Sequence, residues 1–201
     1  MKKLFLILFL LLGVAVTATA TTLNFDELSP GIILSNQYAL QGIIFSNSNL
    51  YLRTYDVTSI PLGPPFTLPI AIWADNYFHQ GNKSKATFSV PINYFSITMG
   101  DRQFDADNLY LRAYDGANNL IGSDDDFIPA NDGSSITAAT LSVNTLSYIH
   151  HVEFWGVGFW ENSVYFDNVE FGMTPVPEPS LMVLLGISMM SIVGLRRWWR
   201  E

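Results

Sequence analysis

Apolar and polar residues alternate with a period of two over much of the chain, and this pattern limits the fold more than any other feature. In the segment LYLRAY at 109–114, the leucines and the alanine would lie on one side of an extended strand, and the tyrosines and the arginine on the other. A strand with one buried and one solvated face is typical of an antiparallel sheet. The pattern therefore predicts a domain built from sheets.

Other segments repeat this alternation, and residues that favour turns separate them. The turn Asp115-Gly116-Ala117-Asn118-Asn119 predicts a hairpin whose return strand begins at Leu120. The four prolines within 60–69 predict an extended loop. About nine or ten strands in one domain predict an all-β, antiparallel β-sandwich with a jelly-roll-like topology. The predicted strands are 22–26, 41–46, 50–55, 86–90, 94–99, 108–114, 136–143, 149–155 and 164–171.

One octapeptide occurs twice. Residues 49–56 read NLYLRTYD and residues 108–115 read NLYLRAYD, so seven of the eight positions are identical. Because the flanking residues do not match, the repeat does not indicate a duplicated domain. We interpret the two copies as similarly placed strands, each followed by a turn.

The N-terminus has the three parts of a secretory signal peptide. Met1-Lys2-Lys3 is basic, the run Leu4 to Leu12 is apolar, and Ala18-Thr19-Ala20 provides the small residues of a cleavage site at Ala18 and Ala20. A retained membrane anchor is the alternative, but the apolar run is short for a membrane span. We therefore expect a signal peptide at 1–20 and a folded domain at 21–173.

The C-terminal segment 174–201 differs from the domain in composition. The prolines on either side of Glu178 cannot continue a helix or a strand, and the uncharged run Leu181 to Leu195 predicts a transmembrane helix at 181–195. At about 1.5 Å per residue this helix spans about 22 Å, less than the roughly 30 Å of a bilayer core, so Trp198 and Trp199 would lie at the interface. The basic tip predicts that this end stays in the cytoplasm.

This order of motif, helix and basic tip resembles the PEP-CTERM sorting signal of exported proteins of Gram-negative bacteria. The resemblance is carried by the motif Pro177, Glu178 and Pro179 and by the basic tip Arg196, Arg197 and Arg200. It implies cleavage by a membrane protease of the exosortase type. It also implies transient anchoring in the inner membrane, followed by transfer to the cell surface or the extracellular matrix. A plain C-terminal anchor is the alternative, and it too would place the domain outside the cytoplasm.

The domain is also similar, in patches, to the sandwich domains that many PEP-CTERM proteins carry. The patches are 23–28, 41–45, 111–115 and 165–171. This resemblance implies a secreted jelly-roll domain associated with exopolysaccharide and biofilm matrix. It brings no catalytic residues with it.

The predicted domain is strongly acidic and has no cysteine. Residues 21–173 contain sixteen Asp and Glu against five Lys and Arg, a net charge of −11 compared with −8 for the whole chain. Nucleic acid and anionic membrane surfaces are disfavoured as partners, because phosphate binding needs clustered cations. Divalent cations and neutral or cationic polymers remain as partners, and any metal would bind to oxygen or histidine. Acidity that only keeps an exported domain soluble is the alternative.

A structural calcium site is predicted where the first and last strands would meet. Terminal strands are often neighbours in jelly-rolls, and the apolar positions of 164–171 change parity after Asp167, which predicts a β-bulge at Asp167-Asn168. A bulge frees backbone carbonyls, and calcium prefers oxygen ligands. Solvated carboxylates at a turn or bulge are the alternative. The predicted ligands are Asp26, Glu27, Asp167 and Asn168.

Two further segments are rich in carboxylates. Asp101, Asp105, Asp107 and Asn108 fall in a segment dense with oxygen ligands, but their spacing does not match an EF-hand. The run at 124–126 is interpreted as a solvated turn, because water and salt screen exposed like charges.

Aromatic residues provide a candidate glycan site. Trp155 and Trp160 flank two glycines, so a loosened loop could expose an indole ring to the face of a sugar. Core packing is the alternative, because aromatic side chains dominate sandwich interiors.

No enzymatic function is predicted. A glycoside hydrolase needs two carboxylates at a defined separation, and the sequence does not fix the distance between Glu153 and Glu161. No Gly-x-Ser-x-Gly motif is present to activate a serine. We therefore predict an exported, non-enzymatic surface or matrix protein that binds exopolysaccharide. A purely structural or adhesive module, and a glycoside hydrolase as the least favoured, are the alternatives.

Overall fold

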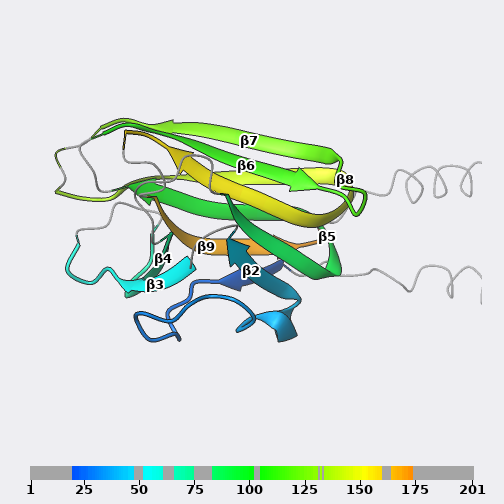
Figure 1. The fold of residues 1–201 in the computed structure, drawn as a ribbon, viewed down its shortest axis with the longest axis horizontal. Coiled ribbons are helices and arrows are strands. Elements are labelled where there is room, and N and C mark those ends of the chain that lie inside the picture. Colours follow the sequence, from blue (N-terminus) through cyan, green and yellow to red (C-terminus); the bar gives the residue numbers. More distant parts are fainter. Residues whose placement is uncertain are drawn as a thin grey trace, which may run out of the picture. The chain divides into compact units, whose positions relative to one another are not determined.

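Figure 1 shows the fold of the computed structural model, which describes residues 20–47, 52–60, 66–74, 83–101, 105–130, 132, 134–159 and 164–173. The predicted signal peptide up to residue 19, the predicted sorting signal at 174–201 and Trp160 lie outside these residues. All described residues belong to one compact unit. Within them, no helix has the length and hydropathy needed to cross a bilayer.

The described residues form an all-β, antiparallel fold, which confirms the prediction from the alternation. A short 3₁₀ turn, η1 (Ala39–Gln41), precedes the second strand. The strands are β1 (Ala20–Leu23), β2 (Ile43–Asn47), β3 (Leu52–Asp56), β4 (Ile70–Ala74), β5 (Ser84–Asp101), β6 (Asp107–Tyr114), β7 (Leu120–Ile128), β8 (Thr137–Val157) and β9 (Tyr165–Gly172).

The two longest strands, β5 and β8, take part in two layers. Residues 94–101 of β5 pair with β9 and with the first part of β8, whereas residues 84–88 pair with β2 and with the last part of β8. The register between β5 and β8 shifts around Ile92, where the strands pass from one layer to the other. β1, β3 and β4 extend the β9 layer, and β6 and β7 extend the other (Figure 1). This arrangement is consistent with the predicted β-sandwich.

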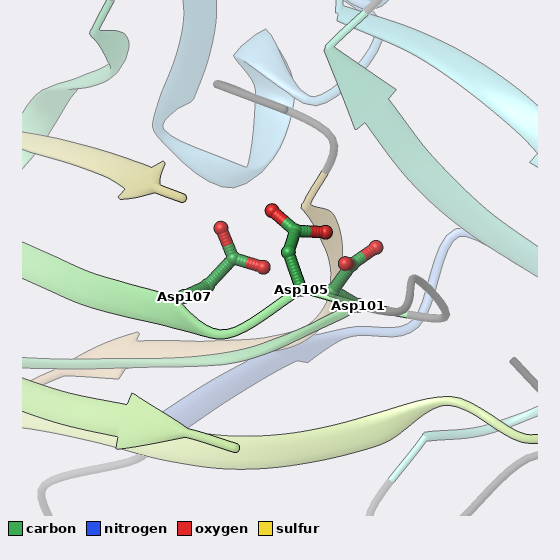
Figure 2. Close-up of side chains that lie close together, drawn as sticks. All are labelled: Asp101, Asp105 and Asp107. Atoms are coloured by element: carbon green, nitrogen blue, oxygen red, sulfur yellow. The ribbon is translucent and has the colours of Figure 1, made fainter. Parts of the chain in front are cut away.

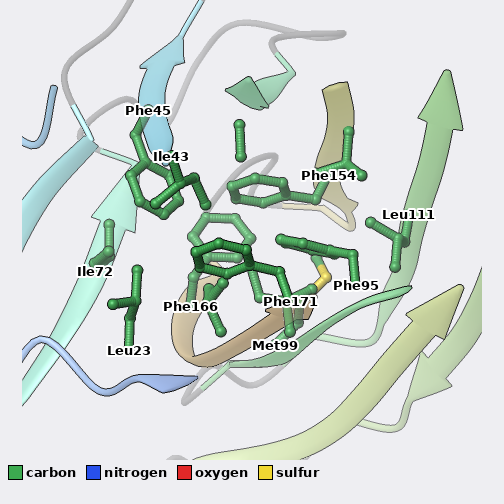
Figure 3. Close-up of a cluster of buried hydrophobic side chains, with 14 of the residues drawn as sticks. Leu23, Ile43, Phe45, Ile72, Phe95, Met99, Leu111, Phe154, Phe166 and Phe171 are labelled. Carbon is green, nitrogen blue, oxygen red and sulfur yellow. The ribbon is translucent and has the colours of Figure 1, made fainter. Parts of the chain in front are cut away.

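The core lies between the layers and is built from the inward side of each strand. Alternate residues of β6 are fully buried, as the pattern at 109–114 predicts. Phe154 of β8 meets Phe166 of β9 edge to face, with ring centroids 4.9 Å apart. Phe95 and Phe171 belong to the same cluster (Figure 3). Burial of each such side chain contributes about 1.5–3 kcal/mol, so this cluster holds the layers together.

The predicted hairpin between β6 and β7 is confirmed. The side chain of Asp115 accepts hydrogen bonds from the backbone N–H groups of Ala117 and Asn119. Asn118 has a φ of 65°, in the left-handed region that asparagine tolerates better than most residues. The turn therefore forms from its own side chains, as its sequence predicts.

Three features differ from the predicted strands. The predicted segments 86–90 and 94–99 are one strand, β5, and 136–143 and 149–155 are one strand, β8. The prediction misses β4, which follows directly after the proline-rich segment and has no alternation. The solvated turn predicted at 124–126 is wrong, because these residues pair with 109–111 of β6 and lie within β7.

Candidate functional sites

The first and last strands lie side by side, as predicted, because β1 pairs with the second half of β9. The predicted bulge in β9 is also confirmed. Opposite β5, the register shifts between Glu170 and Asp167, and Asn168 has a φ of 46°. The extra residue keeps the apolar side chains on both sides of the bulge inward, and it buries Asp167 with them.

The chain itself supplies hydrogen-bond donors to the buried carboxylate of Asp167. Its Oδ2 accepts hydrogen bonds from the backbone N–H and the hydroxyl of Thr67, at 2.8 and 2.9 Å. Its Oδ1 accepts one from the backbone N–H of Asn168, at 2.7 Å. Burial raises the pKa of Asp167 to about 6, and the three donors oppose this rise because they stabilise the ionised form.

The other two carboxylates of the predicted calcium set are also bonded within the protein. Asp26 Oδ1 accepts a hydrogen bond from the backbone N–H of Ile70 at 3.1 Å. Glu27 accepts one from the hydroxyl of Tyr38 at 2.5 Å, and burial together with this bond raises the pKa of Tyr38. Every carboxylate of the set therefore has a protein donor. Calcium binding by Asp26, Glu27, Asp167 and Asn168 stays a prediction.

Trp155 lies on the outer face of strand β8, so the prediction that a loop carries it is wrong. Its ring stacks on that of Tyr110, the residue opposite on β6, with centroids 5.1 Å apart and planes 19° apart. On the β5 side, the ammonium group of Lys83 lies 4.5 Å from the centroid of the Trp155 ring. Because β8 runs between β5 and β6, both faces of the indole contact the protein. A sugar could therefore reach only the edge of the Trp155 ring, rather than stack on one of its faces as predicted.

Charged side chains surround this stack. Lys83 forms an ion pair with Glu153 at 2.9 Å, and Arg112 forms one with Asp125 of β7. Glu153, one carboxylate of the hydrolase alternative, is thus held by a lysine. The other, Glu161, lies outside the described residues.

The first copy of the octapeptide forms a second aromatic group. As on β6, an arginine and a tyrosine of the repeat lie beside a tryptophan of the next strand. Arg53 of β3 pairs with Trp73 of β4, and the ring of Tyr55 meets that of Trp73 edge to face at 5.8 Å. Tyr165 of β9 stacks on Trp73 at 6.3 Å. Both copies form strands, as interpreted from the sequence, but they are not similarly placed. The aromatic contact involves the seventh residue of the first copy, Tyr55, and the third residue of the second, Tyr110. β3 ends the strand order, whereas β6 lies between β8 and β7.

Tyr55 stands beside a shallow hollow in the surface. The hollow has a volume of about 540 Å³, and its lining includes Arg53, Tyr55, Asp56 and Thr58. Tyr55 is 42% exposed, so its ring is open to solvent in a way that the half-buried Trp155 ring is not. Hydrogen bonds from the hydroxyl and the backbone N–H of Thr58 lower the pKa of Asp56, which is therefore an ionised acceptor. The sequence predictions missed this site, and the repeated octapeptide was the signal that could have found it.

Three aspartates meet where β5 ends and β6 begins. Asp101 is the last residue of β5, Asp107 is the first of β6, and Asp105 lies between them. Figure 2 shows the three side chains close together, and a carboxylate oxygen from each lies within 4.8 Å of the others. Burial, followed by the charges of Asp101 and Asp105, raises the pKa of Asp107 to about 8. Asn108, the fourth member of this segment, is exposed.

Comparison with known proteins shows the fold but not a family. No family model matches the chain, and no curated protein matches it. A DUF4465 family protein from Bacteroides caccae is 11% identical, the match covers 76% of this chain and 98% of that one, and the TM-score is 0.51. This likeness shows a shared β-fold.

Two other solved structures have TM-scores below 0.5 and carry no argument about function. A carbohydrate binding module of family 29 is 12% identical over 78% of this chain and 90% of that one, with a TM-score of 0.46. The arabinose-bound MgGH51 α-L-arabinofuranosidase is 13% identical over 74% of this chain, with a TM-score of 0.48. The match covers only 25% of that enzyme's chain.

Proposed function

We propose that the protein is an exported, non-enzymatic surface or matrix protein that binds polysaccharide, and that the hollow beside Tyr55 is the binding site. The observation that carries the proposal is an exposed aromatic ring that shares one hollow with a carboxylate, a guanidinium group and hydroxyls. Aromatic rings offer an apolar surface to the C–H groups of a sugar, and a few placed polar groups bind its hydroxyls. The jelly-roll-like sandwich serves as the rigid carrier of this site.

A neutral polysaccharide fits this hollow better than a charged one. Within the hollow, the guanidinium group of Arg53 and the carboxylate of Asp56 balance one another in charge. The net charge of −11 for residues 21–173 repels anionic polymers. The hollow is also shallow, which suits a ligand that extends along the surface.

Affinity electrophoresis of the purified protein through gels that contain neutral polysaccharides tests this proposal. We expect Tyr55→Ala to weaken binding by about tenfold, because an aromatic contact contributes about 0.5–1.5 kcal/mol beyond its buried area. Trp155→Ala is the matched control, since it removes an outer-face aromatic ring whose two faces are already covered. Thermal melting of both variants checks that they remain folded.

The remaining outcomes each have a clear meaning. Loss of binding in Trp155→Ala alone would move the site to the residue predicted from the sequence. Free migration of the unmodified protein through neutral, cationic and acidic polysaccharides would contradict glycan binding. The structural or adhesive module would then be the better function, and the closed stacking around Trp155 and the exposed Leu146 and Phe159 favour it as the second candidate.

Sorting through the PEP-CTERM signal is the second part of the proposal. It is supported by the order of the sequence motifs at 1–20 and 174–201. We expect Glu178→Ala, and separately the replacement of the three tip arginines by serine, to hold the protein in the membrane fraction or to deplete it from the cell. Cell fractionation and immunoblotting measure this. Normal release of both variants would exclude an exosortase-type protease as a partner.

A further inference from the structure

The geometry points to a calcium-binding site formed by Asp101, Asp105 and Asp107 at the junction of β5 and β6. The three carboxylates come from a short stretch of chain and lie close together (Figure 2). Their nearest oxygens lie within 4.8 Å of one another. Oxygens that surround one Ca²⁺ at about 2.3–2.6 Å can be separated by up to about 5 Å, so a single ion can contact all three.

Burial and the lack of donors at Asp107 support the site independently of this proximity. Asp107 is 0% exposed and Asp101 is 2% exposed. In the described part of the chain, neither carboxylate oxygen of Asp107 accepts a hydrogen bond. A buried carboxylate without donors is strongly destabilising unless it binds a proton or a cation. The two oxygens of Asp107 therefore provide ligand positions that no donor among the described residues occupies.

The two neighbouring carboxylates increase the need of Asp107 for a bound proton or cation. Like charges this close cannot all ionise in a buried place without a compensating charge. A divalent cation would neutralise two of the three negative charges and let all three carboxylates ionise.

The backbone of Gly158, the residue after β8, lies against the cluster. A Cβ placed on this glycine would collide with Asp107 Oδ1 and would lie 2.7 Å from Asp105 Oδ2 and 2.9 Å from the carbonyl oxygen of Ala106. The carbonyl oxygen of Ala106 is a ligand type that Ca²⁺ accepts readily and Mg²⁺ uses less often in protein sites. The absence of a side chain at 158 keeps the space beside the carboxylates open.

Calcium titration of the full chain, purified in a mild nonionic detergent and stripped with EDTA, tests the site. Isothermal titration calorimetry should show one Ca²⁺ bound per chain. Thermal melting followed by circular dichroism should show a rise in Tm of roughly 5–10 °C at a Ca²⁺ concentration about 100-fold above Kd. Mg²⁺ at the same concentration should give a smaller rise.

Two ligand variants and one control locate the ion. Asp105→Asn is the first variant, because Asp105 is only partly buried and its amide should not disturb the fold. Asp107→Asn is the second. Each should weaken Ca²⁺ binding about tenfold or more, because the number of charged ligands sets the affinity. Asp167→Asn, which changes an equally buried carboxylate in β9, should bind Ca²⁺ as the unmodified protein does.

Three results would overturn the proposal. The first is no heat of binding and no change in Tm at millimolar Ca²⁺, which would leave a proton shared among the carboxylates. The second is unchanged binding by both Asp105→Asn and Asp107→Asn. The third is loss of binding in Asp167→Asn alone, which would place the ion at the terminal strands instead.

Discussion

Asp107 and Asp167 are both 0% exposed, yet their surroundings are opposite. Asp167 accepts three hydrogen bonds, two from Thr67 and one from Asn168. Asp107 accepts none from the described residues and lies beside two more carboxylates. Burial raises the pKa of Asp167 to about 6 and, with the added repulsion, that of Asp107 to about 8. Because the two carboxylates are equally buried, the difference between their pKa values comes from the groups that surround each one.

The contrast separates two uses of a buried carboxylate. A carboxylate surrounded by N–H and O–H donors fixes the backbone around it, as Asp167 does for the bulge in β9. A carboxylate without donors, among others of its kind, needs a proton or a cation to be stable. Burial and acidic density are therefore less informative about metal binding than the count of donors.

The largest expected effect is from Asp167→Ala. This change leaves two backbone N–H groups and the hydroxyl of Thr67 without their acceptor inside the protein. We expect a loss of about 3–4 kcal/mol in the free energy of unfolding, measured by urea denaturation. Thr67→Val, which removes only the hydroxyl, should cost about 1 kcal/mol. A loss below 1 kcal/mol for Asp167→Ala would show that the three donors do not make Asp167 a stabilising group, and its contrast with Asp107 would fail.

The second prediction concerns pH. The pKa of Asp167 is about 6 in the folded protein, against an ordinary value of 3.8 for an aspartate, so the folded state binds more protons between these values. The stability that this carboxyl contributes is present below about pH 4 and is lost as the pH rises through 6, by about 2–3 kcal/mol. The difference between the unmodified protein and Asp167→Asn, measured from pH 4 to 7, isolates this loss. A constant difference across that range would show that Asp167 does not titrate there.

The third and smallest effect has the opposite sign. With chelator present, Asp107→Asn should stabilise the protein by about 1–2 kcal/mol, because a neutral amide can donate to the neighbouring carboxylates instead of repelling them. Asp125→Asn changes an exposed carboxylate paired with Arg112, so it is the matched control and should change stability by less than about 1 kcal/mol. If Asp107→Asn destabilises the protein in chelator, Asp107 has a stabilising partner and the contrast with Asp167 disappears.

The sequence predicts the features of this fold that depend on neighbouring residues in the chain. Period-two alternation defines most strands because each residue's side of the sheet follows from its position alone. The bulge at Asp167-Asn168 follows from parity, since apolar residues on both sides of it must face inward. The hairpin turn at 115–119 forms from its own side chains.

Features that depend on distant partners are missed. β4 has no alternation because both of its sides are covered: Ile70 and Ile72 pack in the main core, and Ala71 packs with Val57 and Phe66 in a smaller cluster. β5 and β8 read as two segments each, because their patterns break where they pass between the layers. The burial of both sides of β4 and the passage of β5 and β8 between layers depend on how all the strands pack together, which no local pattern shows.

In the candidate sites too, the sequence shows what depends on nearby residues and misses what depends on distant ones. The sequence shows how many carboxylates each segment contains, but the donors that satisfy Asp167 include Thr67, 100 residues away. It shows the glycines beside Trp155, but Lys83, which covers that ring, precedes β5 and is distant in the sequence. The hollow that Tyr55 lines includes residues of the segments 30–31 and 53–59, which the fold brings together.

The pairing of β1 with β9 has a mechanical consequence. Ala20 lies opposite Gly172, so the domain's two ends emerge together, and tension between them would unzip this pair one hydrogen bond at a time. Tyr165, at the other end of β9, lies 6.0 Å from Tyr55 between ring centroids. A polymer that pulls at Tyr55 while the C-terminal end is tethered would instead load the β3–β4 and β4–β9 pairs along the strand direction, where several hydrogen bonds share the force. We therefore expect the domain to resist force along its strands better than force that separates β1 from β9.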